Sequence, residues 1–170
     1  FLNDFNFIQS LPAYRNSEMN DDVMAKLRGK IAKQINCSDK EIAIMRNTTE
    51  ALNNAIFGIP MNKSDEVVAS VHEYDSMMGS FYQRKMREGI VIKNVEIPYK
   101  ITDSKEVVAL FEKAITPKTK VFLISQIIWI SGQIYPIKEI CELAKKHNIL
   151  TIVDAAQSFS HIPIDVKDLG

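Results

Sequence analysis

Residues 149–157 read Ile-Leu-Thr-Ile-Val-Asp-Ala-Ala-Gln, an apolar run that ends on a carboxylate and is followed by an amide. The run is typical of a buried strand. Ligands bind beyond the carboxyl ends of strands in open α/β sheets, so this strand end is a candidate site. Asp154 could hold a ring nitrogen protonated, and Gln157 could donate a hydrogen bond to a ring oxygen. Alternatively, Asp154 caps the following turn and Gln157 is solvated, and these residues alone leave both interpretations open.

The rest of the chain repeats short apolar runs separated by helical patterns. The apolar runs lie at residues 42–45, 66–71, 91–97 and 120–125, and helical spacing of apolar residues spans 103–114 and 137–147. Strands that alternate with helices are typical of parallel α/β architecture, and runs without a period of two are typical of strands covered on both faces. We therefore predict an α/β fold, a three-layer sandwich with a mainly parallel sheet.

The first forty residues are organised differently. Residues 21–35 have apolar side chains at the spacing of an amphipathic helix, and no strand pattern precedes them. We therefore divide the chain into an amino-terminal arm and helix, residues 1–40, and an α/β domain, residues 41–170. No internal repeat and no linker rich in Pro, Gly or Ser divides the sequence further.

Composition and charge restrict the classes of function. Of 170 residues, 46% are hydrophobic and 25% are charged, which is typical of a globular domain. Lys plus Arg and Asp plus Glu both total 21, so charge gives no support for binding nucleic acid or an anionic membrane. No segment is apolar for long enough to span a bilayer, and we expect a cytoplasmic protein. Cys37 and Cys141 lack neighbours at metal-ligand spacing, so we expect reduced thiols and no metal site.

A candidate anion site lies at residues 46–50, Arg-Asn-Thr-Thr-Glu, where a predicted helix begins. The unpaired backbone N–H groups and the dipole of a helix amino terminus favour an anion such as phosphate. The hydroxyls of Thr48 and Thr49 add further donors. The alternative is plain capping of the helix by Asn47 or Thr48 together with Glu50. No Gly-rich dinucleotide motif or Walker motif occurs here.

Two aromatic residues follow other predicted strands. Tyr74 comes shortly after the run at 66–71, and Trp129, the only tryptophan, follows the run at 120–125. Tyr74 could lie over a planar ligand or be a partly buried loop residue, and Trp129 could line a pocket or fill a gap in the packing. The anion site, the aromatic ring and the acid and amide pair all follow strands at one edge of the sheet. A phosphorylated pyridine is a ligand that uses all of them.

Taken together, these segments resemble the class V aminotransferase family of pyridoxal-phosphate enzymes, the fold type I group that includes cysteine desulfurases, selenocysteine lyases and isopenicillin N epimerase-like proteins. The resemblance runs from about residue 42 to residue 170. It rests on Arg46-Asn-Thr-Thr-Glu-Ala-Leu-Asn53, His72-Glu-Tyr74, Gly132-Gln-Ile-Tyr-Pro136 and Val153-Asp-Ala-Ala-Gln157-Ser-Phe-Ser-His-Ile-Pro-Ile-Asp165. The resemblance implies that residues 41–170 are the amino-terminal part of the cofactor-binding large domain.

The resemblance also implies a role for each candidate residue toward pyridoxal 5'-phosphate. Thr48 and Thr49 would bind its phosphate, and Tyr74 would stack on its ring. Asp154, the catalytic residue of this set, would pair with the pyridine nitrogen, and Gln157 would approach the phenolic oxygen. A protonated ring nitrogen makes the ring an electron sink for a carbanion at the α-carbon of an amino acid.

The sequence departs from the family pattern at two places. In the loop after the run at 120–125, where desulfurases usually have Asn, it has Trp129, which resembles the aromatic residue of some lyases and epimerase-like relatives. We therefore assign Trp129 to the substrate pocket. Ser160 stands where Gly is common in the family, which is expected to alter the local turn.

No lysine of this sequence has the Ser-x-His-Lys context in which the family carries its Schiff-base lysine. We expect this lysine, the remaining strands and the small carboxyl-terminal domain to lie outside these 170 residues, and this fragment to be inactive alone. The parent protein is expected to be a homodimer that acts on an amino acid by transamination, epimerisation or carbon-sulfur cleavage. The alternatives are a cysteine desulfurase and a degenerate or split α/β module without catalytic activity.

Overall fold

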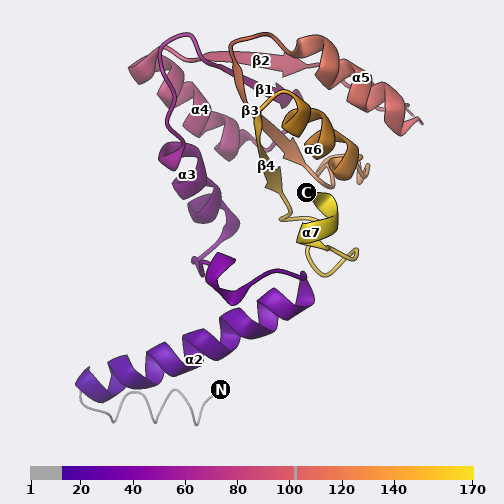
Figure 1. Ribbon diagram of the computed structural model, residues 1–170. Coiled ribbons are helices and arrows are strands. Elements are labelled where there is room, and N and C mark those ends of the chain that lie inside the picture. Colours follow the sequence, from indigo (N-terminus) through magenta and orange to yellow (C-terminus); the bar gives the residue numbers. More distant parts are fainter. Residues whose placement is uncertain (1–12, 102) are drawn as a thin grey trace. The chain divides into compact units, whose positions relative to one another are not determined.

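The computed structural model describes residues 13–101 and 103–170 (Figure 1). Its helices are α2 (Ala13–Gln34), the 3-10 helix η1 (Asp39–Glu41), α3 (Thr48–Gly58), α4 (Asp75–Glu88), α5 (Ser104–Ala114), α6 (Ile137–Lys146) and α7 (Val166–Leu169). Its strands are β1 (Glu66–Ser70), β2 (Val91–Val95), β3 (Thr119–Ser125) and β4 (Leu150–Asp154). The described residues form two compact units, one with residues 13–44 together with 165–167, and the other with the described residues of 45–164 and 168–170.

In the first unit, α2 confirms the helix predicted at 21–35 and begins earlier in the chain. The strand predicted at 42–45 is wrong, because these residues have no strand conformation. Ser38 and Glu41 form a capping box that starts η1 directly before this run. Among the residues that the structure describes, no neighbouring strand pairs with the run, so apolar character alone does not make it a strand.

In the second unit, four parallel strands form one sheet in the order β2-β1-β3-β4 (Figure 1). The strands predicted at 66–71, 91–97, 120–125 and 149–153 are confirmed apart from their end residues. The central strands β1 and β3 are buried at nearly every position, whereas the outer strands β2 and β4 have exposed positions. The expectation of cover on both faces therefore holds for the central strands.

Helices cover both faces of the sheet, which confirms the predicted three-layer α/β sandwich. On one face, α3 and α4 pack over a core that includes Ile56 and Leu123. On the other face, α5 and α6 pack over a core that includes Phe111 and Phe122, whose rings meet edge to face at 5.2 Å. The two helices predicted from apolar spacing at 103–114 and 137–147 thus lie on the same face.

The connections between strands change direction between β1 and β3. From β1 the chain passes through α4 to β2 on one side, and it returns through α5 to β3 on the other side. Open α/β sheets bind ligands beyond the carboxyl ends of the strands at such a switch point. The two strands that meet there, β1 and β3, end at Ser70 and Ser125, and Ser125 is directly paired with Asp154 at the end of β4.

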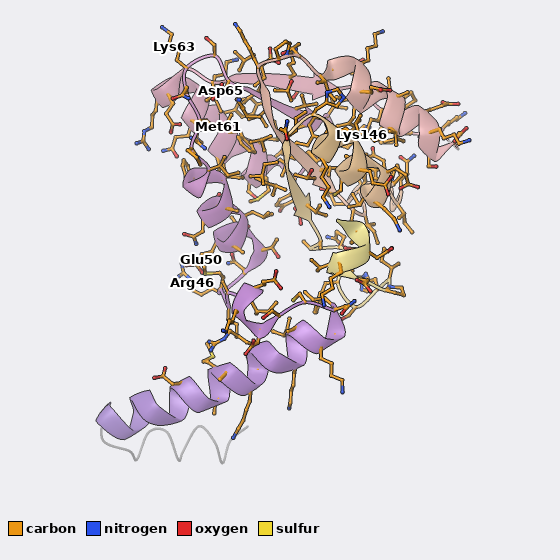
Figure 2. All side chains as sticks on the ribbon, in the orientation of Figure 1. Arg46, Glu50, Met61, Lys63, Asp65 and Lys146 are labelled. Carbon is orange, nitrogen blue, oxygen red and sulfur yellow. The ribbon has the colours of Figure 1, made fainter. Side chains whose placement is uncertain are left out.

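At the opposite edge, where the strands begin, a tight turn leads into β1. This turn contains Met61, Lys63 and Asp65 (Figure 2). The backbone N–H of Asn62 donates a hydrogen bond of 2.7 Å to Asp65 Oδ2, which fixes the turn. The carboxylate of Asp65 therefore stabilises its own turn by accepting a backbone hydrogen bond.

Glu66, the first residue of β1, is buried at this amino edge and has three polar partners. Its Oε2 accepts hydrogen bonds from the hydroxyls of Thr116 at 2.5 Å and Thr119 at 3.2 Å, and it pairs with Lys93 Nζ at 3.1 Å. Burial acts to raise the pKa of Glu66, but the partners outweigh burial and the pKa is lowered. The negative charge of Glu66 is thus matched by a cation of the protein itself.

Candidate functional site

A pocket opens at the carboxyl edge of the sheet, on the face covered by α3 and α4. Its lining comprises Thr48, Thr49, Leu52, Tyr74, Met77, Ser125, Ile127, Trp129, Asp154, Ala156 and Gln157. All six residues selected from the sequence are in this list, although they come from three loops and a helix start. The volume of about 130 Å³ is close to the roughly 150 Å³ of a cavity that holds benzene, so it suits a single aromatic ring.

Asp154 ends β4 and presents a buried carboxylate to this pocket, with 8% of the residue exposed. Its Oδ1 accepts a hydrogen bond of 2.9 Å from the backbone N–H of Ala156. The capping interpretation is therefore right for one oxygen. Among the residues that the structure describes, the Asp154 side chain has no other hydrogen bond and no ion pair, which leaves Oδ2 for a ligand.

Gln157 also lines the pocket, from the turn after β4, and its side chain is exposed. Its backbone carbonyl accepts a hydrogen bond of 2.8 Å from His161 Nδ1, which holds the turn together. In the same turn Ser160 has a φ of +65°, in the left-handed region where glycine is favoured. Ser160 therefore adopts a backbone conformation that glycine reaches without strain.

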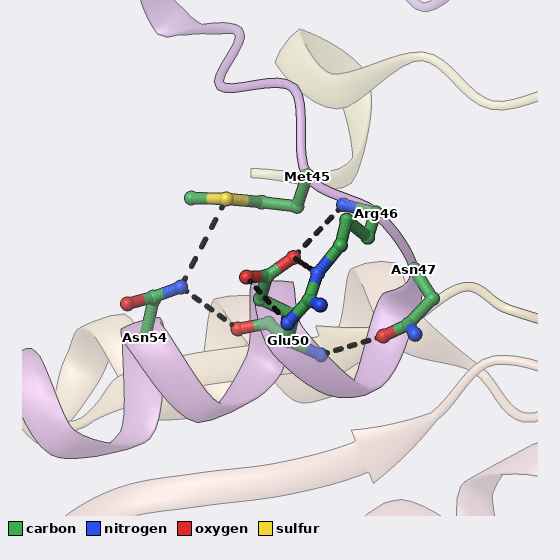
Figure 3. Close-up of polar contacts among 5 residues, drawn as sticks. All are labelled: Met45, Arg46, Asn47, Glu50 and Asn54. Carbon is green, nitrogen blue, oxygen red and sulfur yellow. Dashed lines mark hydrogen bonds and ion pairs between the residues drawn. The ribbon is translucent and has the colours of Figure 1, made fainter.

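The start of α3 supplies the candidate anion site (Figure 3). Asn47 is the N-cap, and its side chain accepts a hydrogen bond of 2.9 Å from the backbone N–H of Glu50. Glu50 turns outward and pairs with Arg46 Nε at 3.1 Å. The capping interpretation is thus right for Asn47. Asn47 caps the helix, and Glu50 pairs with Arg46. Thr48 and Thr49 are therefore not needed as caps, and they line the pocket beside the first N–H groups of the helix.

Tyr74 and Trp129 form an aromatic wall of the pocket. Their ring centroids lie 5.7 Å apart with the planes nearly perpendicular, at 89°. Both residues remain about half exposed, Tyr74 at 48% and Trp129 at 51%. Rings used only for packing are usually more buried, so the exposure of both rings at the pocket favours the ligand-lining interpretation.

Glu73 lies in this region, and no role was predicted for it from the sequence. It lies three residues after β1, is only 5% exposed, and accepts hydrogen bonds of 2.6 Å from the hydroxyls of both Ser70 and Ser125. Burial raises the pKa of Glu73 to about 7, and the charge of Asp154 adds to the increase. A glutamate in a loop normally points to solvent, so no sequence signal indicated that this side chain turns inward.

Other kinds of site are not found in the described part of the chain. Within residues 13–101 and 103–170, no three His, Cys, Asp or Glu side chains gather to hold a metal ion. The described helices also include none with the length and apolar character needed to cross a membrane. Cys141 is buried, and burial raises the pKa of its thiol.

The sequence matches the model of the family "Aminotransferase class-V" over residues 10–170. The chain belongs to the class V aminotransferase family. This confirms the resemblance found in its motifs, and with it membership of a family of pyridoxal-phosphate-dependent enzymes.

Among curated proteins the chain is similar to a probable cysteine desulfurase of Synechocystis sp., with 32% identity over 91% of this chain and 37% of the relative. A probable cysteine desulfurase of Halalkalibacterium halodurans is 35% identical over 84% of this chain and 36% of its own length. The isopenicillin N epimerase of Streptomyces clavuligerus is 27% identical over 82% and 35%. The chain thus spans a little over a third of the length of these relatives.

Solved structures support the same fold. The cystine C-S lyase C-DES, in complex with its reaction product cysteine persulfide, superimposes with a TM-score of 0.89, at 22% identity over 97% of this chain and 45% of that chain. The cysteine desulfurase CsdA from Escherichia coli gives a TM-score of 0.79, at 21% identity over 94% and 40%. Another C-DES structure carries glycine covalently linked to its PLP cofactor.

The chemical groups of the pocket residues suit those of the family's cofactor, pyridoxal phosphate. A carboxylate with one uncommitted oxygen, Asp154, suits a protonated ring nitrogen, and hydroxyls at a helix amino terminus suit a phosphate. The apolar side chains of Leu52, Met77 and Ile127 suit the faces and edge of an aromatic ring. The charge and polarity of the pocket therefore agree with one phosphorylated pyridine, and its volume accommodates the ring.

Proposed function

We propose that this chain forms the cofactor pocket of a pyridoxal-phosphate-dependent enzyme that acts on an amino acid. One observation carries the proposal: Thr48, Thr49, Tyr74, Asp154 and Gln157 line a single pocket although they come from three separate segments. These are the residues to which the family resemblance gives cofactor contacts.

The proposed roles follow from the chemistry of each side chain. Thr48 and Thr49, with the amino terminus of α3, hold the phosphate, and Tyr74 covers the ring. Asp154 keeps a proton on the ring nitrogen, and Gln157 donates a hydrogen bond to the phenolic oxygen. The bound cofactor supplies an electron sink that stabilises negative charge at the α-carbon of the substrate.

For the reaction we propose cleavage of a carbon-sulfur bond in a sulfur-containing amino acid. The names of the desulfurase relatives and of the structurally similar cystine lyase support this class. The second candidate is epimerisation, which is supported by the epimerase relative and by Trp129 at the position where desulfurases usually carry Asn. Trp129 borders the pocket, where it would restrict and orient the side chain of the substrate.

Covalent attachment of the cofactor needs a lysine. Among the described residues none of the lysines lines the pocket. We therefore propose that residues outside these 170 supply this lysine, and that the 170 residues alone bind the cofactor reversibly without turning over an amino acid. We further propose that the complete protein is a cytoplasmic homodimer.

The test uses Trp129, the only tryptophan of the chain, as a probe inside the pocket. Pyridoxal phosphate added to the chain should quench the fluorescence of Trp129 with saturation, because the ligand absorbs near-ultraviolet light where tryptophan emits. Pyridoxal without phosphate should bind more weakly, since it leaves the helix terminus unused. The Trp129→Phe variant, followed by equilibrium dialysis, separates loss of signal from loss of binding. Absence of saturable binding by either method would overturn the proposal.

A further inference from the structure

Glu73 lies beneath the pocket at the switch point of the sheet. Its Oε1 accepts a hydrogen bond from Ser70, the last residue of β1, and its Oε2 accepts one from Ser125, the last residue of β3. One carboxyl group therefore joins the ends of the two central strands. Ser125 lines the pocket and is paired in register with Asp154, so Glu73 is separated from the ligand site by one side chain.

In the part of the chain that the structure describes, no cation faces Glu73. Asp154 approaches from β4, and the buried phenol of Tyr135 approaches from the segment before α6. Burial and the charge of Glu73 raise the pKa of Tyr135 above its usual range, so the phenol stays neutral. His72, the preceding residue, directs Nε2 to the carbonyl of Ile97 at 2.7 Å. Within the described residues, Glu73 has no ion pair.

Two carboxylates in one buried, cation-free region repel each other, and the less solvated one retains its proton. Burial, and then the charge of Asp154, raise the pKa of Glu73 to about 7 even though two serine hydroxyls act in the opposite direction. Near neutral pH, therefore, a large share of the molecules carries a proton on Glu73.

We propose that Glu73 is a proton-storing positioning residue for Asp154, which holds a proton while Asp154 faces the pocket alone and releases it when a cationic ring pairs with Asp154. The attraction of a cation at Asp154 offsets the repulsion that Glu73 experiences, which lowers the pKa of Glu73 and favours its ionised form. In this step the O–H bond of Glu73 breaks, the proton passes to solvent, and no electrons are transferred. The ligand identity in this inference rests on the proposed function, whereas the coupling of the two carboxyls does not.

The first experiment examines the coupling in the protein without ligand. Carbon-13 NMR of labelled Glu side chains should give a titration midpoint near pH 7 for Glu73. The Asp154→Asn variant, which removes the charge and keeps the shape, should move this midpoint downward. An unchanged midpoint in Asp154→Asn would overturn the inference, whatever the protein binds.

The second experiment counts protons when pyridoxal phosphate binds at pH 7. Calorimetry in two buffers with different ionisation enthalpies gives this number for the parental protein, for Glu73→Gln and for the control Glu66→Gln. The parental protein should release about 0.5 proton more per ligand than Glu73→Gln, because Glu73 is about half protonated at its pKa. Glu66→Gln should match the parental protein, since its carboxylate is ionised at neutral pH.

The outcomes separate the two proposals. Saturable binding with equal proton counts in the parental protein and Glu73→Gln would overturn the role of Glu73 alone. Absence of binding would overturn the proposed function, and the NMR midpoints would still decide the coupling. If Glu73→Gln does not fold, infrared difference spectra of the parental protein replace it. The band of a neutral carboxyl should disappear on binding, and its persistence would contradict the inference.

Discussion

Two buried glutamates near the ends of the same strand have opposite electrostatic environments. Glu66, at the amino edge of the sheet, accepts hydrogen bonds from two threonines and pairs with Lys93, and its pKa is lowered. Glu73, at the carboxyl edge, accepts hydrogen bonds from two serines but faces another carboxylate, Asp154, and its pKa is raised to about 7.

The difference indicates which edge of the sheet serves stability and which serves binding. At the amino edge the chain supplies the cation that each buried anion needs, so the charges are matched within the fold. At the carboxyl edge the described residues supply no cation to the two acids, which costs stability unless a ligand supplies one. Unmatched buried charge in a pocket is a common property of functional sites.

The largest effect is expected in the pH dependence of stability at Glu73. Its pKa rises from 4.5 in the unfolded chain to about 7 in the fold, so the unfolded state loses its proton first as pH rises. Stability should therefore fall by about 3 kcal/mol between pH 4.5 and pH 7 from this residue. Glu73→Gln should lack this decline, as measured by hydrogen exchange of the β3 amides at pH 5 and pH 8. Parallel profiles of the two proteins would contradict the comparison.

The second effect concerns ligand affinity at the carboxyl edge. Asp154→Ala should weaken binding of pyridoxal phosphate about 10-fold to 100-fold, the range for one hydrogen bond to a charged group. Stability should change little, because loss of the hydrogen bond from the N–H of Ala156 is offset by removal of the repulsion of Glu73. Asp65→Ala is the matched control at the amino edge, where the carboxylate fixes a turn. It should reduce stability and leave affinity unchanged, and the reverse pattern would refute the division of roles.

The third effect is the contribution of Glu66 to stability, whose dependence on pH is opposite to that of Glu73. Because the pKa of Glu66 is lowered, its contribution is present above about pH 4.5 and is lost as pH falls through the folded pKa. Glu66→Gln should cost about 1 kcal/mol at pH 7 and less at pH 3. Hydrogen exchange of the β1 amides, or urea unfolding, measures this difference. A loss that does not diminish in acid would show that packing, and not charge, accounts for it.

The smallest effect concerns the candidate anion site at the start of α3. Thr49→Ala should weaken binding of pyridoxal phosphate about 5-fold, the effect of one lost hydrogen bond of about 1 kcal/mol. Binding of pyridoxal, which lacks the phosphate, should be unaffected. Thr116→Ala at the amino edge removes an equivalent hydroxyl and should leave both affinities unchanged. Equal losses for the two ligands in Thr49→Ala would assign the hydroxyl to another part of the ligand.

Much of the fold followed from the sequence because its central strands are fully buried. Continuous apolar runs identify such strands directly, as at residues 66–71 and 120–125. The same rule gave the wrong result at 42–45, since an apolar run becomes a strand only when a neighbour supplies hydrogen bonds. Whether that neighbour exists is a tertiary property that the local sequence does not carry.

The candidate site was predictable where side-chain chemistry follows a strand end directly. Asp154 and Tyr74 were found in this way, and the structure brings both into one pocket. Glu73 was not found, because its role depends on hydrogen bonds from two serines that end different strands. Ser125, one of them, belongs to another strand, 52 positions away.

The most direct test of the central claim compares two ligands in two proteins. One ligand is pyridoxal phosphate, and the other is its analogue with carbon in place of the ring nitrogen. If the carboxylate of Asp154 pairs with that nitrogen, the parental protein binds the natural ligand more tightly, and Asp154→Ala binds both with equal affinity. If the preference for the nitrogen-containing ligand persists undiminished in Asp154→Ala, the account is wrong.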